Sequence, residues 1–97
     1  MQRRIHPAAE RELVEALERS LAEFGPQVAR NLRLRIEHLA DLLMHEPGLG
    51  TPVPGGARLL ALGRYPYSLV YRVDGDVLHV LALMHHRRKP DYWIARR

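Results

Sequence analysis

No cysteine occurs among the 97 residues of the chain. This absence excludes disulfide bonds, thiolate catalysis and the usual structural zinc sites. The chain also lacks any apolar stretch near the roughly 18 residues that a membrane-spanning helix requires. Residues 1–7 carry charge but no hydrophobic block follows them, so no secretory signal is visible. We therefore expect a cytoplasmic protein that does not enter the membrane.

Lysine is nearly absent, since Lys89 is the one lysine beside fourteen arginines. Arginine suits bidentate contacts with phosphate or carboxylate groups, although GC-rich coding produces the same bias. The charge is uneven: residues 1–56 carry seven arginines and eight acids, whereas residues 57–97 carry eight basic residues and three acids. A basic half indicates an acidic partner, which could be nucleic acid, an acidic protein segment or both.

The length and composition predict a single globular domain over residues 1–97. Hydrophobic residues make up 46% of the chain and charged residues 27%, which is ordinary for a globular protein and enough for one two-layer core. None of the six histidines shows paired ligand spacing with a nearby carboxylate. We expect no metal site and no other cofactor.

The first half of the chain predicts a short strand and a helical hairpin. We expect the strand at residues 2–6, and Pro7 to open a helix at its first position. Gly25-Pro26 ends that helix and starts a second one, which must stop by Glu46 because Pro47 follows. Apolar residues recur at helical spacing in both segments: Leu13, Leu17, Leu21 and Phe24 in the first, and Val28, Leu32, Ile36, Leu39 and Leu43 in the second.

The second half predicts a loop followed by three antiparallel strands. Seven of the ten residues at 47–56 are glycine or proline, so we expect a loop with neither helix nor paired strand. Strands are expected at 58–62, 67–73 and 77–84, the last two joined by a tight turn. The fold class is therefore α+β, in the order β-α-α-β-β-β. A helical hairpin packs on one face of a small antiparallel sheet, and a basic C-terminal tail follows.

One helical hairpin can cover only one face of this sheet, yet the last strand is apolar on both. Strict alternation places Leu78, Val80, Ala82 and Met84 on one side, and Val77, His79, Leu81 and Leu83 on the other. A strand that is apolar on both faces is normally covered on both. Either the C-terminal segment or another chain must cover the second face, and we favour a partner chain.

The thirteen residues from His85 to Arg97 concentrate the chemistry of the chain. Five are basic and one is acidic, so their net charge of +4 equals that of the whole protein. His85 and His86 open the segment, and Tyr92 and Trp93 lie inside it. Groups that can move protons, bind phosphate or stack on a base thus follow a predicted core strand. We expect a site here, and we expect Trp93 to anchor the tail by packing.

Several short motifs recur in this chain in a characteristic order, and together they resemble the RelE/ParE superfamily of bacterial type II toxins over nearly the whole length. The tail, with an arginine two residues before proline and Tyr-Trp shortly after, is most similar to the ParE-like branch. The motifs are Pro7-Ala8-Ala9, Gly25-Pro26 with Ala29, Pro47-Gly48, Gly56-Ala57-Arg58, Tyr65-Pro66-Tyr67, Val70-Tyr71-Arg72-Val73 and His85-His86-Arg87-Arg88-Lys89-Pro90-Asp91-Tyr92-Trp93.

The resemblance implies a toxin that is neutralised by an antitoxin encoded beside it. In this family the C-terminal segment of the antitoxin wraps the toxin, and the complex commonly represses its own operator. We therefore expect a hetero-oligomer with a cognate antitoxin, and contact with operator DNA only through that complex. The antitoxin would supply the missing cover of the sheet by contacting Leu69, Tyr71, Val73, Leu81 and Leu83.

The two branches of the superfamily differ in their targets. RelE-like toxins enter the ribosome and cleave mRNA, whereas ParE-like toxins inhibit DNA gyrase and are not known as nucleases. For RNA cleavage, His85 or His86 could transfer protons, Tyr92 could relay one, and Arg58 and Arg88 could stabilise the phosphorane. The resemblance places Arg88 and Tyr92 where RelE-like nucleases carry functional Arg and Tyr.

One departure from the nuclease pattern favours the gyrase inhibitor. RelE-like nucleases place an arginine three residues before the tyrosine of the middle strand, where this chain has Ser68 before Tyr71. The lysines that RelE uses around the first strand of the sheet are absent too. By analogy we favour gyrase inhibition, with mRNA cleavage or an inactive antitoxin-binding homologue as alternatives. The expected target-binding residues are Arg58, His85, His86, Arg87, Arg88, Tyr92 and Trp93.

Overall fold

Proline and glycine set the boundaries of the two helices. The helices begin at Pro7 and Pro26, as predicted, because the proline ring preorganises the first helical turn. His6 caps the first helix, since its Nδ1 accepts a hydrogen bond of 3.0 Å from the Ala8 N–H. Gly25 joins the helices with φ +87°, a conformation that favours glycine.

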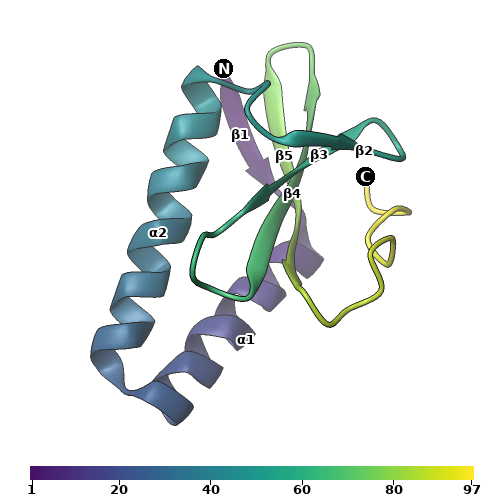
Figure 1. Cartoon of the computed structure of the whole chain (residues 1–97). Helices are drawn as coiled ribbons and strands as arrows, with labels where there is room; N and C mark the ends of the chain where they lie inside the picture. Colours follow the sequence, from purple (N-terminus) through teal and green to yellow (C-terminus); the bar gives the residue numbers. More distant parts are fainter.

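The computed structural model describes all 97 residues, which form two helices and five strands (Figure 1). The expected α+β fold class is confirmed, with one strand more than predicted. The elements are β1 (Gln2–Ile5), α1 (Pro7–Phe24), α2 (Pro26–His45), β2 (Thr51–Val53), β3 (Ala57–Ala61), β4 (Tyr67–Asp74) and β5 (Val77–His85).

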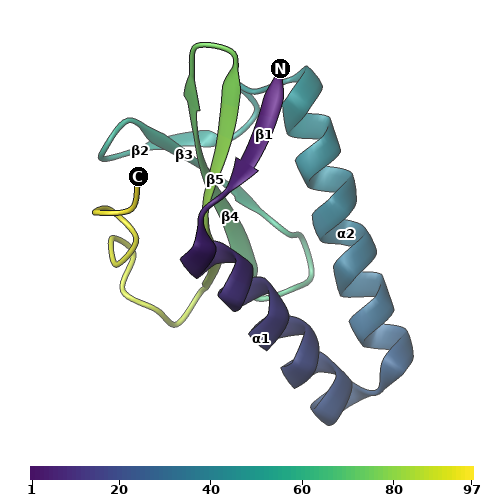
Figure 2. The ribbon, with the colours of Figure 1, turned by 180° about the vertical axis from the view of Figure 1, so that it is seen from behind.

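The strands form one open sheet in the order β1-β5-β4-β3-β2. β1 runs parallel to β5, with Gln2 opposite Val77 and Ile5 opposite Val80, and the other neighbours are antiparallel. Seen from behind, β1 leads directly into α1 at the edge of the sheet (Figure 2). The first and last strands of the chain are therefore neighbours.

The prediction that residues 47–56 contain no paired strand was wrong. Residues Thr51–Val53 pair with β3, with Thr51 opposite Leu59 and Val53 opposite Ala57. Because β2 is the outermost strand of the sheet, Pro52 can lie in it although it has no N–H to donate. Proline is unfavourable in central strands, and the prediction wrongly applied this rule to an edge strand.

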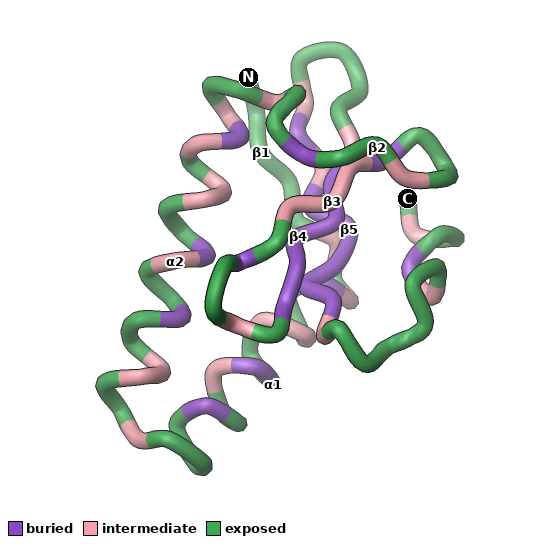
Figure 3. The backbone as a smooth tube through the Cα atoms, viewed as in Figure 1, coloured by how far each residue is buried: buried purple, intermediate pink, exposed green.

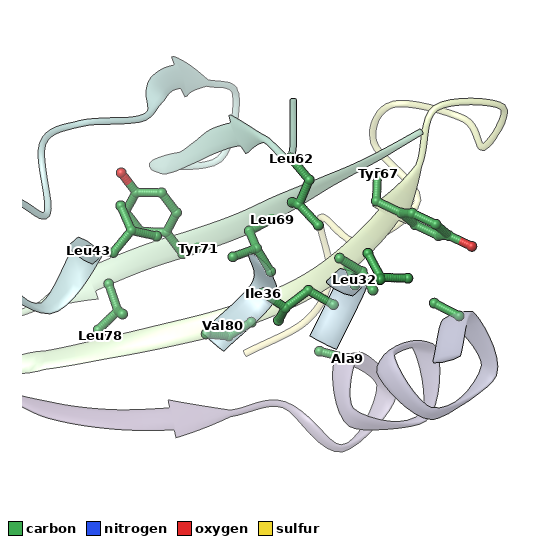
Figure 4. Packing of buried hydrophobic residues seen from close by; sticks show 12 residues of the cluster. Ala9, Leu32, Ile36, Leu43, Leu62, Tyr67, Leu69, Tyr71, Leu78 and Val80 are labelled. Atoms are coloured by element: carbon green, nitrogen blue, oxygen red, sulfur yellow. The ribbon is translucent and has the colours of Figure 1, made fainter. Parts of the chain in front are cut away.

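The main core lies between the helices and one face of the sheet (Figures 3 and 4). The C-terminal half of the α1 apolar stripe lies outside it, since Leu21 is 52% exposed and Phe24 66% exposed. The helical hairpin extends past the sheet at this end (Figure 1). The buried members of the core are Ala9, Ala16, Leu32, Ile36, Leu43, Leu62, Tyr67, Leu69, Tyr71, Leu78, Val80 and Leu83.

A β-bulge at Leu81 corrects the predicted alternation of β5. Val70 lies opposite Ala82 and Tyr71 opposite Val80, so Leu81 is an extra residue without a direct partner. A one-residue insertion reverses which face each following side chain occupies. Leu83 therefore packs under the helices, whereas Ala82 joins Leu81 on the opposite face.

The chain's own C-terminal segment covers that opposite face, so the preference for a partner chain as its cover was wrong. Trp93 is 2% exposed and packs in this second cluster, and its indole N–H donates to the Pro90 carbonyl at 2.8 Å. Figure 1 shows the segment on the side of the sheet away from α2. The buried members of the cluster are Ala57, Val70, Leu81, Ala82, Met84 and Trp93.

Tyr71 fixes the loop between α2 and β2 from inside the core. Its hydroxyl donates to the Pro47 carbonyl at 2.7 Å and accepts the Gly50 N–H at 2.8 Å. A Cβ at Gly50 would lie 2.7 Å from that hydroxyl oxygen, so the contact requires glycine. Arg58 holds the same loop, donating to the carbonyls of Gly50 at 2.7 Å and Gly48 at 3.3 Å.

We expect Tyr71→Phe to lower the free energy of unfolding by about 1–3 kcal/mol, because it leaves the buried Gly50 N–H and the partly buried Pro47 carbonyl without their partner. Chemical denaturation measures this loss. Tyr65→Phe is the matched control, since no hydrogen bond of its hydroxyl is recorded and Tyr65 is only partly buried. Equal effects of the two substitutions would contradict the assignment.

Candidate functional site

A pocket of about 260 Å³ lies between α1, the end of β5 and the C-terminal segment. It brings together four residues of the predicted site, His85, Arg87, Arg88 and Tyr92. Helix α1 forms the facing wall. The remaining lining residues are Glu12, Glu15, Ala16, Arg19, Tyr67 and Leu83.

Glu12 ties the C-terminal segment to α1 and to β5. Its carboxylate accepts hydrogen bonds from the Tyr92 hydroxyl at 2.7 Å and from the Arg96 guanidinium at 2.7 and 3.1 Å. It also accepts the backbone N–H of Leu83 at 3.2 Å. The Glu12 and Arg96 side chains are only 12% and 17% exposed, so this ion pair is largely shielded from water.

The Glu12–Arg96 pair lies beside the part of β5 that extends beyond the end of β1. β1 ends at Ile5, opposite Val80, so the edge of β5 beyond Val80 has no strand beside it. Arg96 donates to the Leu81 carbonyl at 3.0 Å, and Glu12 accepts the Leu83 N–H. Two side chains therefore complete the hydrogen bonding that a longer β1 would provide.

The same contacts determine the protonation of Tyr92 and Arg96. Burial raises the pKa of the Tyr92 phenol well above its usual range, and the hydrogen bond to Glu12 raises it further. The hydrogen bond to Glu12 also raises the pKa of Arg96. Tyr92 therefore keeps its proton at neutral pH and donates it to a fixed acceptor, which makes it a poor proton relay.

Arg88 is held over the face of the Tyr92 ring. Its guanidinium carbon lies 3.9 Å from the ring centroid, and that of Arg96 lies 5.0 Å from it. Such cation–π contacts contribute about 0.5–2 kcal/mol. Arg88 makes no salt bridge with a carboxylate. It is thus a positioned cation without a counter-charge of its own.

The surroundings of His85 favour its neutral form. Partial burial lowers its pKa, and the charges of Arg19, Arg87 and His86 lower it further. Its Nδ1 accepts the backbone N–H of Arg87 at 3.0 Å, so the ring hydrogen of the neutral form lies on Nε2. The ring packs edge-on against Tyr67, with the centroids 5.1 Å apart.

The other predicted site residues lie outside this pocket. His86 is exposed, and its Nε2 lies 3.0 Å from the Ser68 hydroxyl. Trp93 is buried, as expected for an anchor of the tail. Arg58 binds the loop carbonyls of Gly48 and Gly50 and does not line the pocket.

Four of the five residues expected to contact an antitoxin are buried within the chain itself. Leu69, Tyr71 and Leu83 lie under the helices, and Leu81 lies in the second cluster. Only Val73, at 37% exposure, reaches the surface. The expectation assumed that one face of the sheet is uncovered. In the structure the bulge turns Leu83 towards the helices, and the folded-back tail covers the opposite face.

Sequence reasoning missed the contribution of α1 to the site. None of the residues expected at the site lies in α1, although Glu12 and Arg19 line the pocket. Their spacing could have indicated this, because Glu12 and Arg19 lie on the same side of the helix as Ala9 and Ala16, at positions i, i+3, i+7 and i+10. Ala9 and Ala16 are buried there, so this side faces the sheet and the tail.

No three His, Asp or Glu side chains are grouped so that they could hold a metal ion. Neither helix has the length and apolar character needed to cross a membrane.

We expect Glu12→Ala to cost about 3 kcal/mol of stability, because it leaves Arg96 partly buried without its carboxylate. Amide hydrogen exchange should accelerate at Leu83 and in residues 92–96. Glu15→Ala, one turn further along α1 at an exposed position, is the matched control and should leave these amides protected. Unchanged exchange in Glu12→Ala would show that the tail is held by other contacts.

Comparison with known proteins finds a matching family and a similar solved structure. The family model described as "ParE toxin of type II toxin-antitoxin system, parDE" matches residues 3–90. A solved structure titled "Chromosomal ParDE TA system from P. aeruginosa" superposes with a TM-score of 0.74 at 26% sequence identity, covering 88% of this chain and 95% of that chain. No curated protein sequence matches. Because the family model covers residues 3–90, most of the chain, the protein belongs to the ParE toxin family of type II toxin–antitoxin systems.

Proposed function

We propose that this toxin inhibits DNA gyrase in the cytoplasm and is neutralised by a cognate antitoxin. The family match supports a toxin of the ParE type. The observation that carries the proposal is the set of cations around the C-terminal segment, with Arg88 held on the Tyr92 ring and free of any carboxylate. A fixed surface cation of this kind suits binding to an acidic target.

The geometry gives less support to mRNA cleavage. Tyr92 donates its proton to Glu12 and has a raised pKa, so it is not available as a general acid or base near neutral pH. Arg58 makes hydrogen bonds to a loop at another part of the sheet. His85 lines the pocket and could transfer protons at that pH.

For the antitoxin we propose a docking groove between β1 and the helical hairpin, in place of the sheet face. This groove has a volume of about 430 Å³. Val14 and Ile5 line it and are 49% and 38% exposed. The outer edge of β1 has no neighbouring strand. An amphipathic antitoxin segment could bury these apolar side chains and pair with that edge.

We expect expression of this chain to arrest growth, and Arg88→Ala to relieve the arrest, because the substitution removes the positioned cation. Inhibited gyrase predicts linearised or relaxed plasmid and an induced DNA-damage response. Purified gyrase should supercoil DNA more slowly when the wild-type chain is added. About tenfold more Arg88→Ala should be needed for the same inhibition, the effect of one lost charged contact.

Arg64→Ala is the matched control, since Arg64 is an exposed arginine outside the pocket and without a salt bridge. Translation-dependent cuts in transcripts with intact DNA would instead identify a nuclease. Loss of toxicity in a folded His85→Ala, His86→Ala double variant would also favour a nuclease. Normal growth on expression of the wild-type chain alone would identify an inactive homologue.

We expect Val14→Asp to weaken binding of the antitoxin encoded by the adjacent reading frame at least tenfold, because a charge would enter an apolar contact. Leu34→Asp is the matched control. Leu34 is also a helical residue and 49% exposed, but it does not line the groove. Titration calorimetry with the purified antitoxin measures both. Equal affinities would place the antitoxin elsewhere on the toxin.

A further inference from the structure

The pocket at the C-terminal segment holds more positive charge than the fold neutralises. Glu12 is engaged by Arg96. Three arginines that line the pocket, Arg19, Arg87 and Arg88, form no salt bridge. Glu15 is the one remaining acid in the lining, and it is exposed. The pocket therefore presents three cations against a single free carboxylate.

These cations come from two parts of the chain that the fold holds together. Arg19 projects from α1, whereas Arg87 and Arg88 follow the end of β5. Glu12 fixes the Tyr92 hydroxyl, and the Tyr92 ring positions Arg88. Cations of the same sign gathered around one hollow repel one another, and a bound anion would remove that repulsion.

His85 adds a neutral donor to the same pocket. Because its Nδ1 accepts the Arg87 N–H, its Nε2 carries the hydrogen and can donate to an anion without a change of protonation. Protonation at Nδ1 would break the bond from Arg87.

We propose that this pocket binds a phosphate group of a nucleic acid. A single carboxylate is satisfied by the two parallel N–H groups of one guanidinium. Three guanidinium groups and an imidazole N–H exceed that need and suit the larger number of acceptor oxygens on phosphate. The phosphate could belong to the backbone or to a strand end, since both offer the same oxygens.

Occupancy should be coupled to the protonation of His85. The groups that face His85 are Arg19, Glu12 and Glu15 from α1, Tyr67 from β4, and His86, Arg87, Arg88 and Tyr92 from the tail. Partial burial lowers its pKa in the free protein, and the cations Arg19 and Arg87 lower it further. A phosphate among these cations would offset their charge. The pKa of His85 should therefore rise when phosphate binds. Phosphate binding should strengthen as the pH falls towards the raised pKa of the complex.

The test follows the ring signals of His85 by NMR during titration of the purified full-length chain. The probes are inorganic phosphate, a short single-stranded DNA with and without a 5′-phosphate, and a glutamate-rich peptide. We expect phosphate and DNA to shift these signals and to raise the pKa of His85. Binding that needs the 5′-phosphate would identify a strand end, and binding without it would identify the backbone.

Arg19→Gln should weaken DNA binding about tenfold, the effect of one lost charge-assisted hydrogen bond. Arg87→Gln provides an independent second variant. Arg33→Gln is the matched control, since Arg33 is an exposed helical arginine on α2 outside this pocket, and it should bind as the wild type does.

The proposal fails if phosphate and DNA leave His85 unaffected, or if Arg19→Gln and Arg33→Gln bind DNA equally well. It also fails if the glutamate-rich peptide occupies the pocket and DNA does not, which would identify a protein ligand. These measurements use no gyrase and no living cells. Their failure would therefore leave the proposed toxin activity standing, and a failure of toxicity would leave a measured phosphate site standing.

Discussion

The unequal length of β1 and β5 is the constraint on which the rest of the structure depends. β1 ends opposite Val80, and β5 continues to His85 with β4 on one side and no strand on the side where β1 has ended. The backbone groups of Leu81 and Leu83 on this side would otherwise be left to water. Glu12 and Arg96 supply their hydrogen bonds instead. This arrangement ties a helix near the start of the chain to the last residues of the chain.

The candidate site follows from that tie. Glu12 holds the Tyr92 hydroxyl, the Tyr92 ring supports Arg88, and the segment between them closes the pocket beside His85. On the other side of the sheet, Trp93 covers the second apolar cluster. One short segment thus completes the core and positions the cations. Its stability and its chemistry therefore depend on the same contacts.

Local signals in the sequence were sufficient for most of the fold and for part of the site. Proline and glycine marked the helix boundaries at Pro7, Gly25 and Pro26, and the tail residues His85, Arg87, Arg88 and Tyr92 do line one pocket. Non-local features were missed. The bulge at Leu81 leaves no mark in the sequence, because the residues from Val80 to Met84 are all apolar. The roles of Glu12 and Arg96 depend on contacts between positions far apart in the chain, which a helical pattern alone does not reveal.

The pairing of the first strand with the last has a consequence for synthesis. Because translation begins at the N-terminus, β1 has no partner strand until the codons for β5 have been read. Glu12 gains its partner Arg96 later still, because Arg96 is synthesised after β5. The helical hairpin leaves the ribosome first, with its apolar side uncovered. The cationic pocket is therefore assembled last, once the C-terminal segment has left the ribosome and reached Glu12.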